Sequence, residues 1–115
     1  MSLNLMKRCV IAFALCMCIS SARAANPPTT APAAQVSIDN FNFSPETLTV
    51  AAGTKVTWIN HDDIPHTATS SVKPRLFNSG ALDTDQQFTF EFSTPGVYEY
   101  FCAIHPHMTG KIIVK

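Results

Sequence analysis

Apolar residues alternate with polar residues in short runs along most of the chain, and this pattern constrains the fold more than any other feature. The runs begin near residue 35, and turn residues such as Gly53, Pro95 and Gly96 separate them. A period of two places every second side chain on one face of a β-strand. No segment there shows a sustained helical period, so the pattern predicts an all-β antiparallel sandwich or barrel of about seven strands. The clearest alternating positions are Val36 and Ile38, Phe41 and Phe43, Leu48 and Val50, Val56 and Trp58, and Phe88, Phe90 and Phe92.

Residues 1–24 have the features of a cleavable secretory signal peptide. Lys7 and Arg8 precede a short apolar run, and Ala22 and Ala24 then form an A-x-A cleavage pattern. The apolar run has about 11 residues, whereas a membrane helix requires roughly 20. We therefore expect export to the periplasm with cleavage, rather than an uncleaved anchor, and no membrane insertion after processing.

The remaining chain divides into a lead-in and one domain. Residues 25–34 are rich in Pro, Ala and Thr, which is typical of a flexible segment without a fold of its own. Residues 35–115 carry the strand pattern and are long enough for one modest core, in which we expect Trp58 and the phenylalanines.

Removal of the signal changes both the charge and the cysteine content. The full chain has eight basic and eight acidic residues, and the signal contains three of the basic ones. The mature chain would thus carry five basic and eight acidic residues, which argues against a nucleic-acid partner. Three of the four cysteines also lie in the signal, so Cys102 remains alone. A single thiol in an exported protein indicates a metal ligand, a nucleophile or an intermolecular bridge.

Three candidate metal donors follow one another at intervals of three residues. They are the thiolate of Cys102, the imidazole of His105 and the thioether of Met108. The stretch from Cys102 to Met108 lies between two strand-like segments, so we expect a loop at one end of the sandwich, restricted by Pro106. His66 begins another strand-like segment, and loops at one end of a sandwich lie close together. The four residues His66, Cys102, His105 and Met108 are therefore predicted to bind one metal ion.

Copper is the metal that this donor set favours. Two imidazoles, a thiolate and a weak thioether are the ligands of blue copper electron-transfer sites. Zinc would also accept two histidines and a cysteine, but it gains little from a thioether such as that of Met108. Among the other polar residues, we expect His61 to be solvated, and we expect the acidic pairs Asp62 with Asp63 and Asp83 with Asp85 to cap turns.

The same residues resemble the cupredoxin family, and within it the chain is most similar to the amicyanins, with a wider likeness to plastocyanins. The spacing Cys102-x2-His105-x2-Met108 matches the short ligand loop of amicyanins. The likeness covers roughly residues 35–115 and extends to the segments Phe43-x-Pro45, Val50-x-x-Gly53, Val56-x-Trp58-x-Asn60, Ile64-Pro65-His66 and Pro95-Gly96-x-Tyr98-x-Tyr100. The resemblance implies a Greek-key β-sandwich with one type 1 copper ion.

Two positions depart from the family pattern. Thr67 stands where the family usually has an asparagine that helps to connect the two ligand loops, although a hydroxyl can make a similar backbone contact. His107 stands where amicyanins have a phenylalanine, which makes the surface beside the loop histidine more polar and introduces a further candidate ligand.

The resemblance and the ligand chemistry together predict an electron carrier, not an enzyme. Copper would alternate between Cu(II) and Cu(I), with His105 as the exposed edge for electron exchange. By resemblance, the partners would be exported redox proteins, namely a donor dehydrogenase and an acceptor cytochrome or oxidase, and the carrier would be monomeric. A copper carrier or buffer that does not shuttle electrons is the alternative. A thiol enzyme using Cys102 and His105 would need an orienting third group, and no such group or oxyanion loop is evident.

Overall fold

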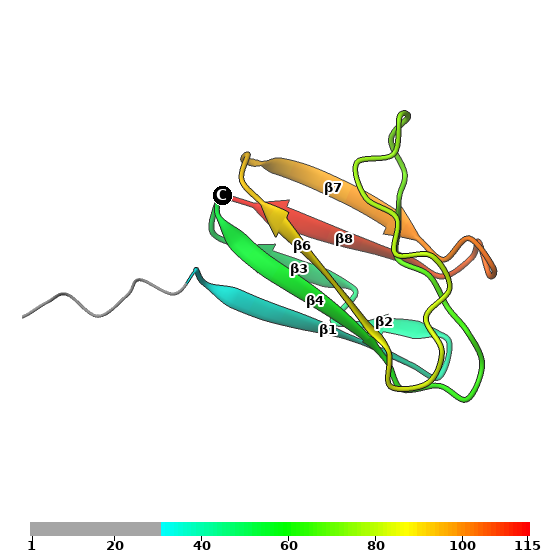
Figure 1. The fold of residues 1–115 in the computed structure, drawn as a ribbon. Helices are drawn as coiled ribbons and strands as arrows, with labels where there is room; N and C mark the ends of the chain where they lie inside the picture. Colours follow the sequence, from blue (N-terminus) through cyan, green and yellow to red (C-terminus); the bar gives the residue numbers. More distant parts are fainter. Residues whose placement is uncertain (1–30) are drawn as a thin grey trace, which may run out of the picture.

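The computed structural model describes residues 31–115, which form two packed β-sheets (Figure 1). The predicted signal over 1–24 and most of the predicted lead-in over 25–34 lie outside the described residues. The end of that lead-in was placed too late, because Ala33 and Ala34 belong to the first strand and pair with Lys55 and Val56. Within the described part, no helix has the length and apolar character needed to cross a membrane. The strands are β1 (Ala33–Asp39), β2 (Asn42–Ser44), β3 (Thr47–Val50), β4 (Thr54–Asn60), β5 (Thr69–Ser70), β6 (Gln87–Phe92), β7 (Gly96–Phe101) and β8 (Thr109–Val114).

The two sheets have the strand orders β2-β1-β4-β6 and β3-β8-β7-β5. The pairs β1 with β4 and β3 with β8 are parallel, and the other pairs are antiparallel. The predicted β-sandwich is confirmed, with eight strands and mixed sheets in place of about seven antiparallel ones. Most consecutive strands lie in different sheets, so their connections cross from one sheet to the other at the ends of the sandwich. The candidate site lies at one of these ends.

The core lies between the two sheets and is rich in aromatic side chains. In β4, Val56 and Trp58 are fully buried while the residues between and beside them reach further out, as the alternation predicts. Trp58 stacks on Phe77, with ring centroids 5.3 Å apart, and meets Tyr100 edge-on at 5.4 Å. Burial of such large rings supplies most of the hydrophobic stabilisation of a domain of this size.

Phe41 departs from the predicted alternation. Phe43 is buried as expected, but Phe41 is 47% exposed. Asn40 and Phe41 both adopt the left-handed backbone conformation, with φ of 50° and 58°, in the turn between β1 and β2. The turn directs the Phe41 ring to the end of the sandwich instead of into the core, so this phenylalanine was wrongly expected to be a core residue.

The side chain of Asn60, at the end of β4, organises the connection that follows. It is fully buried, and its amide nitrogen donates hydrogen bonds to the carbonyls of Ile64 and Leu82 at 2.9 and 2.8 Å. Its carbonyl oxygen accepts a hydrogen bond from the Asp62 N–H at 3.0 Å. The buried amide is therefore satisfied on both sides, as buried polar groups must be, and it holds the segment that leads to His66.

Candidate metal centre

His66 reaches the site from the connection between β4 and β5. Its backbone exchanges two hydrogen bonds with Leu82: the His66 N–H donates to the Leu82 carbonyl at 3.1 Å, and the Leu82 N–H donates back at 2.7 Å. This short bridge fixes the backbone on either side of the imidazole. The position of His66 is thus set by the fold rather than by a flexible loop.

The other candidate ligands lie on the loop from Cys102 to Met108, between β7 and β8. The Cys102 N–H donates to the Met108 carbonyl at 3.0 Å, and the Met108 N–H donates to the His105 carbonyl at 2.9 Å. These bonds close the loop on itself, so its three candidate ligands are held by one compact turn. Met108 is 7% exposed and belongs to the hydrophobic core.

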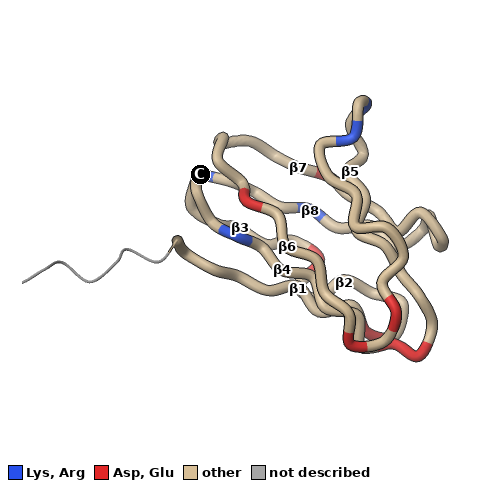
Figure 2. The backbone as a smooth tube through the Cα atoms, in the orientation of Figure 1, with Lys and Arg blue, Asp and Glu red and all other residues tan. Residues whose placement is uncertain are grey.

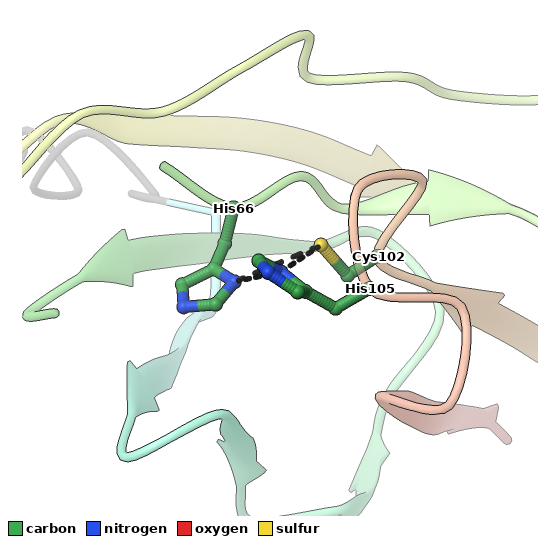
Figure 3. A group of neighbouring side chains, drawn as sticks. All are labelled: His66, Cys102 and His105. Atoms are coloured by element: carbon green, nitrogen blue, oxygen red, sulfur yellow. Dashed lines mark hydrogen bonds between the residues drawn. The ribbon is translucent and has the colours of Figure 1, made fainter. Parts of the chain in front are cut away.

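Figure 3 shows His66, Cys102 and His105 pointing toward one another. The Cys102 Sγ lies 3.7 Å from the His66 Nδ1 and 3.8 Å from the His105 Nδ1, and the two nitrogens are 3.2 Å apart. Zinc, for example, binds nitrogen at about 2.0 Å and sulfur at about 2.3 Å in a tetrahedral arrangement. With angles of roughly 110° at the metal, these bond lengths place the donor atoms about as far apart as the three donor atoms found here. The three donor atoms therefore fit around one ion.

The three side chains differ in their access to solvent. Cys102 and His66 are fully buried, whereas His105 is half-buried. A thiolate and an imidazole in the interior are shielded from competing water. The half-buried imidazole of His105 links the group to the surface of the protein.

The orientation of the His66 imidazole is set by Asp62. The His66 Nε2 lies 2.7 Å from the Asp62 Oδ2. Because a carboxylate only accepts hydrogen bonds, this contact places the proton on Nε2 and leaves the Nδ1 lone pair free to face the Cys102 sulfur. The imidazole thus has the tautomer that a metal ligand requires.

Asp62 also binds the turn between β1 and β2. Its Oδ1 accepts the Asn40 N–H at 2.7 Å, and its Oδ2 accepts the Phe41 N–H at 3.0 Å. Burial by itself would raise the pKa of Asp62, but the hydrogen bonds from these two amides and the interaction with His66 bring it below its usual value. The side chain is therefore a carboxylate at neutral pH.

Thr67 connects the two segments that supply the candidate ligands. Its Oγ1 accepts a hydrogen bond from the Ala103 N–H at 2.8 Å and bonds the Thr69 Oγ1 at 2.9 Å. The Thr67 N–H itself points at the Cys102 Sγ at 3.3 Å. The hydroxyl thus makes the backbone contact between the segments that the sequence suggested it could make.

The other two of the four histidines in the chain lie outside this group. His61 has a side chain that is 43% exposed and lies 4.0 Å from the Asp85 carboxylate. His107 is exposed and is not among the three residues whose ligand atoms converge. Its neighbour Met108 is buried, so successive side chains of the loop point in opposite directions.

Two residues near the site were not anticipated from the sequence. Asp62 was expected only to cap a turn, and it does so, but it also orients His66. Phe41 meets the imidazoles of His66 and His105 edge-on, with centroids 5.3 and 5.2 Å apart. The one signal in the sequence is that Asp62 lies four residues before His66, a spacing too common to be informative alone.

Comparison with known proteins assigns the family. A profile of the cupredoxin-like domain matches residues 8–114. Amicyanin-alpha of Methylorubrum extorquens is 31% identical over 84 residues, which cover 70% of this chain and 71% of the relative. Amicyanin of Paracoccus versutus is 34% identical over 88 residues, which cover 74% and 67%. The chain therefore belongs to the cupredoxin-like domain family.

Solved structures agree with this assignment. A purple cupredoxin from Nitrosopumilus maritimus has a TM-score of 0.67 and 36% identity, covering 71% of this chain and 99% of that one. The Cu(I) form of an amicyanin mutant in which one methionine is replaced by alanine has a TM-score of 0.68 and 28% identity, covering 72% of this chain and 82% of that one. The cofactor of the family is a single type 1 copper ion, and the donor set found here fits it.

Proposed function

We propose that this protein is a periplasmic blue copper protein that shuttles single electrons, with His66, Cys102, His105 and Met108 as the copper ligands. The observation that supports the proposal most strongly is the convergence of one sulfur and two Nδ1 atoms within 4.8 Å, two of the three side chains being buried. When bound, copper supplies one-electron exchange between Cu(II) and Cu(I). As in its relatives, the protein acts as an electron carrier rather than as an enzyme.

The protein residues contribute rigidity and orientation. Cys102 supplies the thiolate, and the N–H of Thr67 stabilises its charge. His66 and His105 would supply nitrogens held in place by the backbone bonds around them, and Met108 would supply a weak thioether. Because the fold fixes these positions, the same arrangement would serve both oxidation states of the metal, and electron transfer would require little rearrangement of the protein.

Electron exchange would take place at the surface around His105. Ile104 and Phe41 beside it are 46% and 47% exposed, and Pro106 is also exposed, which provides a small apolar surface at the edge of the site. Such a surface suits a brief encounter with another exported redox protein through a small interface. By resemblance, a dehydrogenase would be the donor and a cytochrome or oxidase the acceptor.

The acidic residues at the same end of the sandwich as His105 would favour some redox partners over others. Figure 2 shows acidic residues on the loops where β4 ends and β6 begins, whereas most basic residues lie elsewhere. Asp63, Asp83 and Asp85 are exposed on these loops. Opposite charges favour encounter and orientation, so a partner with a basic surface near its own redox centre would associate fastest.

The proposed location rests on the signal-like residues 1–24, with processing after Ala24 and a lead-in that ends before the copper-binding domain begins at β1. In the periplasm the protein would meet copper and its partners as a monomer. N-terminal sequencing of the protein recovered from the periplasm tests this location. A new N-terminus near Ala25 is expected, and retention of Met1 would contradict it.

Voltammetry of the copper-loaded mature protein tests the proposed function. A fast, reversible one-electron wave is expected for an electron carrier. Copper transfer to an acceptor, without such a wave, would favour the alternative of a copper carrier or buffer. The two outcomes are separable because the second requires loss of the metal from the protein, which the absorption spectrum reports.

A further inference from the structure

We infer that Asp62 is a positioning residue of the copper centre, whose one carboxylate holds both the His66 imidazole and the Phe41 turn that covers the ligands. This inference rests on the proposed function, because it concerns how that site is supported. Asp62 coordinates nothing itself. It acts on the centre through His66 and through the backbone of the turn between β1 and β2.

The carboxylate makes three strong contacts at once. It accepts the Asn40 N–H at 2.7 Å, the Phe41 N–H at 3.0 Å and the His66 Nε2–H at 2.7 Å. The side chain is only 11% exposed, so water competes weakly for these bonds. Hydrogen bonds to an ionised acceptor in such a setting are stronger than those between neutral groups.

The turn depends on this support. Asn40 tolerates a left-handed conformation well, but Phe41, with φ of 58°, is a bulky residue in a conformation that such residues rarely adopt. A conformation of this kind persists only when its surroundings impose it, and it is typical of functional sites. Here the two amides donated to one carboxylate impose it.

The turn places an aromatic ring over the candidate ligands. The Phe41 ring stands nearly perpendicular to both imidazoles, at 83° to His66 and 84° to His105. It is half exposed, so its outer face meets solvent while its inner side meets the ligands. The Asp62 carboxylate thereby sets the tautomer of His66 and also holds the Phe41 ring against the imidazoles of His66 and His105.

The Asp62→Asn variant tests the inference, with Asp63→Asn as a matched control, because Asp63 is the neighbouring acid and is exposed. Loss of a carboxylate behind a ligand histidine typically weakens metal affinity by about 10- to 100-fold. We expect a loss of that size in Cu(II) affinity, measured by competition with a chelator. We also expect a higher reduction potential, because removal of a negative charge disfavours Cu(II). Asp62→Glu keeps the carboxylate and should recover part of both effects.

A second measurement reports on the turn directly. Amide hydrogen exchange in the diamagnetic Cu(I) form should speed up at Asn40 and Phe41 in Asp62→Asn, and should be unchanged there in Asp63→Asn. Circular dichroism establishes that the variant is folded, and the exchange rates are read whether or not its copper affinity has fallen. A variant with wild-type potential and wild-type exchange at these two amides would overturn the inference.

The outcomes separate this inference from the proposed function. If the wild-type protein forms the coloured Cu(II) centre and Asp62→Asn matches it in affinity, potential and exchange, the inference fails and the function stands. If the wild-type protein itself forms no such centre, both fail. A selective effect of Asp62→Asn, partly recovered by Asp62→Glu and absent in Asp63→Asn, supports the inference.

Discussion

Among single residues, the proposed ligand Met108 would distinguish a copper site from a zinc site. Its neighbours Cys102 and His105 would serve either metal, but a thioether suits copper and its reduced state in particular. Met108 is buried at the end of a loop whose backbone is closed by hydrogen bonds to Cys102 and His105. We therefore propose that this residue tunes the reduction potential.

Replacement of this thioether by an amide tests that role. Met108→Gln should retain copper but lower the reduction potential, because an amide oxygen is a harder donor and stabilises Cu(II) relative to Cu(I). Voltammetry measures the change. His107→Gln is the matched control, since His107 is the preceding, exposed residue of the same loop. A Met108→Gln potential equal to that of the wild type would show that Met108 is not an axial ligand.

The candidate ligands can be predicted from the sequence more readily than the residues that hold them in position. Cys102, His105 and Met108 stand out because three unusual donors recur at a regular interval, and His66 because it follows Pro65 at the start of a new segment. Asp62 does not stand out, since Asp63 beside it has the same chemistry and the same polar surroundings. Only the folded turn between β1 and β2 brings amides to one of the two carboxylates and leaves the other exposed.

At the scale of elements, the local alternation predicts most strands but not how they pair. Val56 and Trp58 point into the core as their period of two requires. The parallel pairing of β1 with β4 and of β3 with β8 could not be read from the pattern, because pairing depends on partners distant in the chain. Phe41 also shows this limit, since its alternation with Phe43 is interrupted by a turn that reverses its direction.

The pairing of β7 with β8 depends on a glycine. Gly110 is opposite Tyr100 in this pair, and a Cβ atom at Gly110 would lie 2.3 Å from the Tyr100 ring. Tyr100 is buried against Trp58 and cannot move freely. The absence of a side chain at residue 110 is therefore what allows the ring to lie across the strand that follows the ligand loop.

Gly110→Ala should destabilise the protein for this reason. Overpacking of a well-filled core typically costs about 1–3 kcal/mol, and we expect a fall of that size in the free energy of unfolding, measured by denaturant titration of the copper-free protein. Thr109→Ala is the control, since Thr109 is the adjacent, exposed residue of β8. Equal stabilities for Gly110→Ala and the wild type would mean that the ring is not held where we describe it.

For the whole molecule, the buried tyrosine of the aromatic core makes the folded state less stable at alkaline pH. Burial raises the pKa of Tyr100 from 10.0 to about 12. Between these values the unfolded chain has lost the phenolic proton while the folded protein still holds it. The folded state then binds more protons than the unfolded state, so the free energy of unfolding falls as pH rises through this range.

The size of this alkaline loss can be measured. One pKa unit corresponds to about 1.4 kcal/mol, so the full shift would remove about 2–3 kcal/mol of stability between pH 10 and about 12. Denaturant titrations of the copper-free protein across this range measure the slope. Tyr100→Phe should flatten it and cost little at neutral pH, because the Tyr100 hydroxyl has no hydrogen-bond partner within residues 31–115. An equally steep slope in Tyr100→Phe would assign the loss to other groups.

We propose that side chains from separate segments of the fold meet around one copper ion, with the Cys102 sulfur among its ligands. The visible absorption of the mature protein with one equivalent of Cu(II), compared with that of Cys102→Ser, tests it most directly. We expect an intense thiolate-to-copper band in the wild type and its loss in the variant. A Cys102→Ser protein that keeps the band, or a wild-type protein that never shows it, would mean that the Cys102 sulfur does not bind copper.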